Sequence, residues 1–219
     1  SLSYIALALF IQTATGYIAS GLTELMDGVG ITLYEADFST EPELKSVMLS
    51  FVYSVIVAPV TEELLMRGFV MKNLCRSGQR FGIIMSAFLF GIWHENLAQF
   101  LLAFAAGCFF GYITVKHYSL IPSIICHMVV NGFAEMFSIC ETYGWDLAST
   151  VIDMVYMLVV LVGLVALIRL YFVERFPRST PAQTERGLRI TLTSPLMLLV
   201  IICHLGAAVM YILQASEVI

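Results

Sequence analysis

Charged side chains are scarce in this sequence. Only 12% of its 219 residues are Asp, Glu, Lys or Arg, whereas 59% are hydrophobic. A soluble domain has about 25% charged residues, because its surface faces water. Several apolar runs approach the roughly 20 residues that span a bilayer, and they lack the alternation of a closed barrel. The composition therefore excludes an ordinary soluble protein and predicts an all-α, polytopic transmembrane helical bundle.

Several motifs of catalysis and metal binding are also missing. The five cysteines stand singly, without C-x-x-C spacing, so we expect free thiols in place of disulfides or a metal cluster. The sequence contains no G-x-S-x-G, and His94-Glu95 lacks the second histidine of H-E-x-x-H because Ala98 stands there. A pair of intramembrane aspartates is absent as well. The common serine, zinc and aspartate hydrolase signatures are therefore excluded.

The apolar runs predict seven to eight membrane segments in a single domain, residues 1–219. We find no internal repeat. Pro59 interrupts the second run, and a break there raises the count to eight, because proline lacks the N–H that a helix interior needs. The polar segments 23–43 and 174–189 are expected to be connections. The predicted helices cover residues 2–21, 44–58 with a continuation to 75, 81–94, 97–116, 120–139, 148–172 and 194–213.

Basic residues set the expected orientation. Lys72, Arg76 and Arg80 lie between the second and third helices, Lys116 follows the fourth, and arginines surround segment 174–189. Seven crossings place all of these on one side of the membrane, which the positive-inside rule assigns to the cytosol. We therefore predict a cytosolic N-terminus and a C-terminus outside.

Three charged side chains interrupt the second apolar run. Glu63 and Arg67 are four residues apart, so they share a helix face and can pair. Glu62 points about 100° away, which leaves it available for another role. The alternative is a structural ion cluster near the cytosolic interface, where Arg67 can reach water. Because an ionisable residue in the apolar core is costly, this segment is a functional candidate.

Two further helices carry polar stripes. Phe90 and His94 are four residues apart on the third helix; His127 and Asn131 are four apart on the fifth, and Glu135 extends that face. Taken alone, His94 is typical of an interfacial residue. Hydrogen bonding between helices is the alternative for the stripe on the fifth helix.

The polar residues of these three helices fall at a common depth. At about 1.5 Å per residue, Glu62, His94, His127 and Asn131 lie roughly 12–21 Å from the basic ends of their helices. We therefore expect them to meet in a shared, partly hydrated cavity. A carboxylate, two imidazoles and a carboxamide suit hydrolysis, because the carboxylate can deprotonate water while histidine and asparagine hold an oxyanion.

Three other ionisable residues stand apart from this set. Glu95 is expected to face an aqueous loop. Asp153 and His204 each stand alone in a helix, so we expect both to be satisfied structural groups.

The three motifs, in chain order, are Glu62-Glu63-x-x-x-Arg67, Phe90-x-x-x-His94 and His127-x-x-x-Asn131. Their order, spacing and placement on successive membrane segments resemble the CPBP (Abi) family of intramembrane proteases, which is related to type II CAAX prenyl endopeptidases. The resemblance covers about residues 44–137, the expected catalytic core. It implies an intramembrane endopeptidase of glutamate type.

The resemblance also implies a role for each motif. Glu62 is the general base on the attacking water, and His94 assists it. His127 and Asn131 form the oxyanion-stabilising pair, while the adjacent ion pair (Glu63–Arg67) holds the base in place. A Glu/His/His set could in principle bind zinc. We favour neither a metal nor a cofactor, because asparagine is a poor zinc ligand.

The expected partners are membrane lipid and a membrane-associated peptide or protein substrate, with no nucleic acid. Prenylation is mainly eukaryotic and the loops are short, so we expect a bacterial plasma-membrane protein that processes peptides or confers self-immunity. The residues choose neither the substrate nor the oligomeric state. The alternative is a non-catalytic immunity or scaffold protein that retains the motif; a transporter is disfavoured because repeat symmetry is absent.

Overall fold

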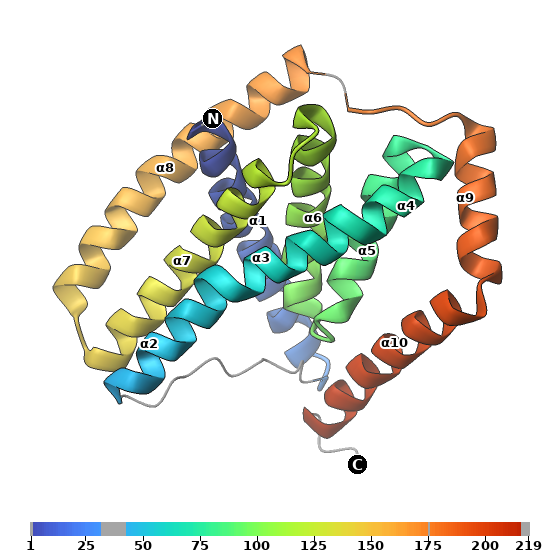
Figure 1. The fold of residues 1–219 in the computed structure, drawn as a ribbon. Helices are drawn as coiled ribbons and strands as arrows, with labels where there is room; N and C mark the ends of the chain where they lie inside the picture. The colour runs from blue at the N-terminus through green and yellow to red at the C-terminus, as the bar shows by residue number, and fades with distance from the viewer. Residues whose placement is uncertain (1, 32–42, 175, 216–219) are drawn as a thin grey trace.

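The computed structural model of this chain is a bundle of helices (Figure 1). It describes residues 2–31, 43–174 and 176–215. The all-α class that the composition predicted is confirmed. The elements are α1 (Leu2–Asp27), α2 (Leu44–Val52), the π-helical η1 (Tyr53–Val57), α3 (Ala58–Glu63), the π-helical η2 (Leu64–Met71), α4 (Lys72–Leu74), the 3₁₀ turn η3 (Cys75–Ser77), α5 (Gln79–Trp93), α6 (Leu97–His117), α7 (Ile121–Tyr143), α8 (Asp146–Val173), α9 (Pro181–Thr193) and α10 (Pro195–Ala215).

Six helical stretches within the described residues are long and apolar enough to cross a bilayer. They are Leu2–Asp27, Leu44–Ser77, Leu97–His117, Ile121–Tyr143, Asp146–Val173 and Pro195–Gln214. α5 is also apolar but has only 15 residues. That length is about 22 Å, which is shorter than the roughly 30 Å hydrocarbon core. The described residues therefore contain six candidate spans, against the seven to eight predicted from the apolar runs. α5 is a further, shorter apolar helix, and His94 follows directly after it.

The main core lies where α1, α6, α7 and α8 pack together, around buried residues such as Leu9, Phe110 and Ile113. α1 and α8 approach closely at Gly163, where a Cβ would overlap the carbonyl oxygen of Ala6. Small residues permit such close helix contacts in membranes. A second apolar cluster joins η2, α5 and α6.

The predicted break at Pro59 is wrong, because residues 44–77 form one continuous helix. Pro59 lies in the first turn of α3, and Val57 and Ala58 before it keep right-handed helical angles. The wider turn of η1 just before it accommodates the proline ring and the missing N–H. η2 begins directly after Glu63, so two π-helical segments flank the two glutamates. Segments of this kind are frequent at functional sites.

The polar segment 174–189, predicted as a connection, contains the start of α9. The Thr180 hydroxyl accepts a hydrogen bond from the Gln183 N–H at 3.2 Å, and the Gln183 side chain accepts one from the Thr180 N–H at 2.9 Å. This capping box, with Pro181 at the first helical position, stabilises the helix start. The prediction is therefore wrong for residues 181–189, where local capping outweighs the polar composition.

Figure 1 shows the N-terminus, α4 and the C-terminal ends of α6 and α8 toward the upper side of the bundle. Lys72 lies in α4, Lys116 in the last turn of α6, and Arg169 near the end of α8. The start of α2 and the turn between α7 and α8 lie on the opposite side. Residues 32–42 of the acidic segment, and residue 175, lie outside the described residues. That the basic side faces the cytosol stays a prediction.

Candidate active site

An ion pair between Glu63 and Arg67 forms the centre of the candidate site. Nη1 of Arg67 lies 2.9 Å from Oε1 of Glu63, and the two side chains are 1% and 0% exposed, respectively. The guanidinium carbon is 4.6 Å from the ring centre of Phe90 and 5.6 Å from that of Phe110. This is the pair that the four-residue spacing predicted. Because both charges are buried, each neutralises the other inside the protein.

The guanidinium of Arg67 is enclosed mainly by packing and by two aromatic ring faces, and it forms few hydrogen bonds. Within the described residues, Nε and Nη2 of Arg67 have no hydrogen-bond partner. A Cβ at Gly107 would stand 3.1 Å from Nη2, so α6 needs a glycine where it passes the guanidinium. The faces of the two aromatic rings compensate part of the missing bonding through cation–π attraction.

His127 lies between the two glutamates. Its Nδ1 is 3.1 Å from Oε1 of Glu63, and its Nε2 is 3.7 Å from Oε2 of Glu62. An ionised carboxylate only accepts hydrogen bonds, so Nδ1 carries a proton and donates it to Glu63. The imidazole packs against Phe110 and Phe90, with ring centroids 5.4 and 6.0 Å away. The two glutamates therefore differ: Glu63 is enclosed and paired, while 37% of the Glu62 side chain is exposed.

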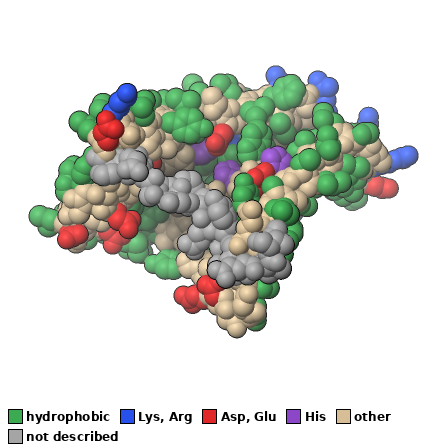
Figure 2. Space-filling model, turned by 90° about the horizontal axis from the view of Figure 1, so that it is seen from below, with side chains coloured by type: hydrophobic (Ala, Val, Ile, Leu, Met, Phe, Trp, Pro, Cys, Tyr) green, Lys and Arg blue, Asp and Glu red, His purple; other side chains and the backbone are tan. Residues whose placement is uncertain are grey.

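His94 is fixed by the end of α5. Its Nδ1 lies 2.8 Å from the carbonyl oxygen of Phe90, and the two rings meet edge to face at 4.9 Å. A carbonyl oxygen only accepts, so Nδ1 donates and Nε2 is the acceptor of the neutral ring. Glu62 and His127 lie within electrostatic range of His94. Seen from below, histidine and acidic side chains gather near the middle of the molecule (Figure 2).

Asn131 lies one turn after His127 on α7, but its hydrogen bond goes elsewhere. Its Nδ2 donates to the carbonyl oxygen of Ser54 in η1 at 2.9 Å. One turn further on, the Ser50 hydroxyl donates to Oε1 of Glu135 at 2.7 Å. The polar face of α7 thus ties this helix to the run 44–57. The structure brings Glu62 and His127 together, with His94 near them, and links Asn131 to the backbone of η1.

Sequence reasoning missed Ser123, one turn before His127. Ser123 is fully buried and lies beside the Glu63 carboxylate. Its hydroxyl accepts from Thr114 at 3.1 Å and donates to the Leu120 carbonyl at 2.9 Å. The four-residue spacing to His127 is visible in the sequence. A search for ionisable residues passes over serine, however, because serine carries no charge.

Two residues expected to stand apart form a pair. Nδ1 of His204 lies 2.7 Å from Oε1 of Glu95. Glu95 lies in the turn after α5 and is partly exposed, and its carboxylate also reaches α10. His204 is satisfied, as expected, and its partner comes from the turn after α5. Asp153 is exposed on α8.

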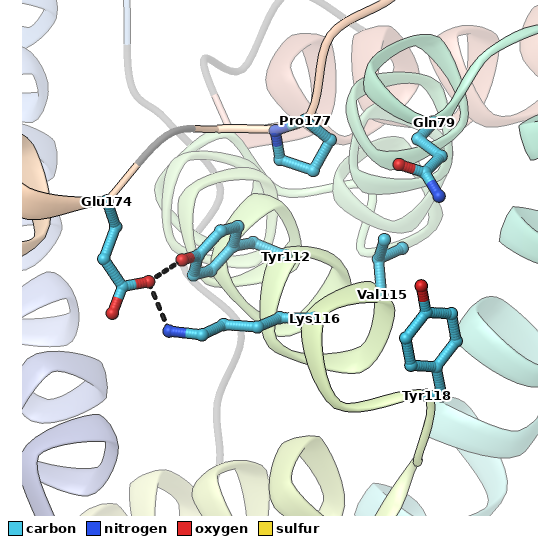
Figure 3. A pocket seen from close by; sticks show the side chains of 7 residues that line it. All are labelled: Gln79, Tyr112, Val115, Lys116, Tyr118, Glu174 and Pro177. Atoms are coloured by element: carbon cyan, nitrogen blue, oxygen red, sulfur yellow. Dashed lines mark hydrogen bonds and ion pairs between the residues drawn. The ribbon is translucent and has the colours of Figure 1, made fainter.

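A pocket of about 430 Å³ lies away from the motif residues, at the end of α6. Figure 3 shows Tyr112 and Lys116 of α6 directed toward Glu174, the residue that follows α8. The Tyr112 hydroxyl donates to the Glu174 carboxylate, and Lys116 forms an ion pair with it. These two donors hold the pKa of Glu174 below its usual range. The pocket belongs to the basic side of the bundle.

The donor set does not fit a metal site. Within residues 2–31, 43–174 and 176–215, no three His, Cys, Asp or Glu side chains are grouped so as to hold a metal ion. A catalytic zinc site needs three converging protein ligands.

Residues 44–133 match the family model described as type II CAAX prenyl endopeptidase Rce1-like. Comparison with curated proteins and with solved structures gave no match. The matched region spans all three motifs, from Glu62 to Asn131, and ends before α8. Together with the six candidate spans, the match makes this an integral membrane protein. As the ordered motifs predicted, the central region of this chain is similar to the type II CAAX prenyl endopeptidases.

Proposed function

We propose that this protein is an intramembrane endopeptidase of glutamate type. It hydrolyses a peptide bond in a membrane-associated peptide or protein by means of an activated water molecule. The observation that carries the proposal is the position of His127 between two unlike carboxylates, 3.1 Å from Glu63 and 3.7 Å from Glu62. Arg67 balances the charge of Glu63, so Glu62 is the carboxylate that remains for proton transfer.

The reaction begins when Glu62 takes a proton from a water molecule that also bonds to Nε2 of His94. The hydroxide attacks the carbonyl carbon of the scissile bond, and the carbonyl oxygen becomes an oxyanion. His127, protonated on both nitrogens, donates from Nε2 to this oxyanion, and Asn131 donates its second amide N–H. The C–N bond then breaks, and the proton on Glu62 passes to the leaving amine.

The Glu63–Arg67 pair positions this machinery. Glu63 accepts from Nδ1 of His127, which fixes the ring so that Nε2 points toward Glu62. The guanidinium between Phe90 and Phe110 keeps Glu63 ionised and in place. One N–H of Asn131 is committed to Ser54, so this bond sets the direction of the other. Catalysis of this kind depends on donors that are oriented before the substrate arrives.

The proposal is tested with purified protein in proteoliposomes and a panel of membrane peptides, both prenylated at a C-terminal cysteine and unprenylated. Glu62→Gln and His127→Ala should each lower cleavage by about 10²–10⁴-fold. Glu135→Gln, on the same face of α7 as His127, is the matched control and should cleave like wild type. Activity should also survive a zinc chelator. Equal cleavage by wild type and both site variants would exclude the proposed mechanism.

A non-catalytic immunity or scaffold role is the alternative. The bonds of His127 to Glu63 and of Asn131 to Ser54 also join helices, as packing contacts do. This role predicts that the nearly isosteric Glu62→Gln preserves the cellular phenotype, whereas the endopeptidase proposal predicts its loss with normal protein levels. A bacterial plasma-membrane location with the N-terminus in the cytosol belongs to the same proposal. Cysteine labelling from either side of the membrane tests that orientation.

A further inference from the structure

His204 contacts the residues on both sides of His94. Its Nδ1 lies 2.7 Å from Oε1 of Glu95, and 27% of each side chain is exposed. Its ring also stacks on Trp93, with centroids 6.1 Å apart and an interplanar angle of 20°. The middle of α10 is thereby connected to the turn that carries a candidate active-site residue.

The backbone of this turn needs support. Glu95 has a φ of 54°, in the left-handed region that residues other than glycine and asparagine rarely adopt. The N–H groups of His94 and Glu95 bond to the carbonyl oxygens of Gly91 and Ile92 at 3.2 Å. A sparsely populated conformation persists only where its surroundings hold it. The side-chain contact of Glu95 with α10 is therefore a restraint on the turn, and so on the ring of His94.

α10 docks on α5 through a narrow face. Met197 and Ile201 pack against the apolar cluster around Phe90, and His204 follows on the same face at helical spacing. None of residues 195–214 is buried. The contact of His204 with Glu95 is thus the polar end of a small interface, so any movement of α10 acts on the His94 turn.

We propose that His204 is a positioning residue for His94. Through Glu95 and Trp93 it fixes the turn after α5, so that the docking of α10 sets the orientation of the His94 ring. The inference rests on the proposed function in that His94 assists the attacking water. It gives the last helix, which lies outside the region of the family match, a part in the reaction.

The first test is independent of any substrate. The chain has four histidines, so histidine labelled with ¹⁵N in the ring gives four sets of side-chain signals, which single substitutions assign. His204→Ala should shift the His94 signals. It should leave those of His117, which bonds to the Tyr4 hydroxyl at the other end of α6, unchanged. Unchanged His94 signals would overturn the proposal. A shift in a protein that cleaves none of the peptides would retain the positioning contact and reject the proposed function.

The second test separates positioning from binding. His204→Ala and Glu95→Ala should lower kcat by about 10–100-fold while KM stays within about twofold. Glycine adopts a positive φ without strain, so the turn in Glu95→Gly needs no contact with α10, and this variant should lose less kcat than Glu95→Ala. His204→Gln, which still offers an N–H donor, should recover most of the lost kcat. His117→Ala is the matched control with wild-type kinetics. A wild-type kcat in both His204→Ala and Glu95→Ala contradicts the proposal.

Discussion

Two ion pairs in this bundle differ in their surroundings. In the Arg67–Glu63 pair the side chains are 1% and 0% exposed, whereas in the Lys116–Glu174 pair they are 34% and 29% exposed. Deep burial makes a missing partner costly, because the remaining charge has neither water nor counter-charge. At the surface, solvent screens the same kind of contact and reduces its contribution. We therefore expect loss of one partner to destabilise the protein strongly at the Arg67–Glu63 pair and only slightly at the Lys116–Glu174 pair.

The largest effect is expected from removing one partner of the buried pair. Arg67→Met should lower the free energy of unfolding by about 3–5 kcal/mol, because Glu63 would stay buried without its cation. Denaturant unfolding in detergent measures this loss. The double variant Glu63→Leu/Arg67→Met should recover most of the stability and still lack activity, because His127 loses the acceptor of its Nδ1 proton. An Arg67→Met protein as stable as wild type would remove the contrast between the two pairs.

A smaller effect is expected from crowding the buried pair. The Cβ of Gly107→Ala would stand 3.0 Å from the Cβ of Ala87 and 3.1 Å from Nη2 of Arg67. Overpacking of this kind costs about 1–3 kcal/mol of stability. Gly16→Ala on α1, where nothing lies within 4 Å of the added methyl group, is the control and should be neutral or slightly stabilising. Equal melting temperatures for the two variants would show that the guanidinium pocket tolerates a methyl group.

The smallest effect is expected at the exposed pair. Glu174→Gln should cost at most about 1 kcal/mol at neutral pH. The pKa of Glu174 is lowered in the folded protein by its bonds to Lys116 and Tyr112. Its contribution is therefore complete above the unfolded-state pKa of about 4.3 and disappears as the pH falls through the lower folded-state value.

Unfolding measured from pH 7 to pH 3 tests this dependence. The stability difference between wild type and Glu174→Gln should shrink at the acid end, while Glu185→Gln, at an exposed glutamate on α9, should show no such trend. A difference that grows on acidification would reverse the sign of the argument.

The helices and the buried pair could be predicted because each depends on local spacing. The long apolar runs form helices that are long enough to cross a bilayer. Glu63 and Arg67, four residues apart, form an ion pair. Pro59 misled the prediction because the rule for proline assumes an α-helical turn, and a π-helical turn relaxes it. The capping box at Thr180 is visible in the sequence, but the prediction followed the polar composition of the segment alone.

Contacts between segments far apart in the sequence were harder to predict. Glu95 and His204 are 109 residues apart in the chain. Each appeared isolated because helix periodicity orders residues along one element and does not say which elements meet. The same limit applies to Asn131, whose bond to Ser54 depends on how α7 crosses η1. The rise per residue along each helix predicted a common depth for the four polar residues of the candidate site. Which of them are in contact depends on how α7 packs against the run 44–77.

The pairing of Glu63 with Arg67 inside one helix has a consequence for biogenesis. Spans enter the bilayer in chain order, and the rings and the histidine that enclose this pair come from later spans. A lone arginine at mid-membrane costs about 2.5–3.5 kcal/mol at insertion. An arginine that arrives with its own carboxylate four residues away enters as a nearly neutral unit. The helix of residues 44–77 can therefore insert into the bilayer before α5, α6 and α7 have been synthesised.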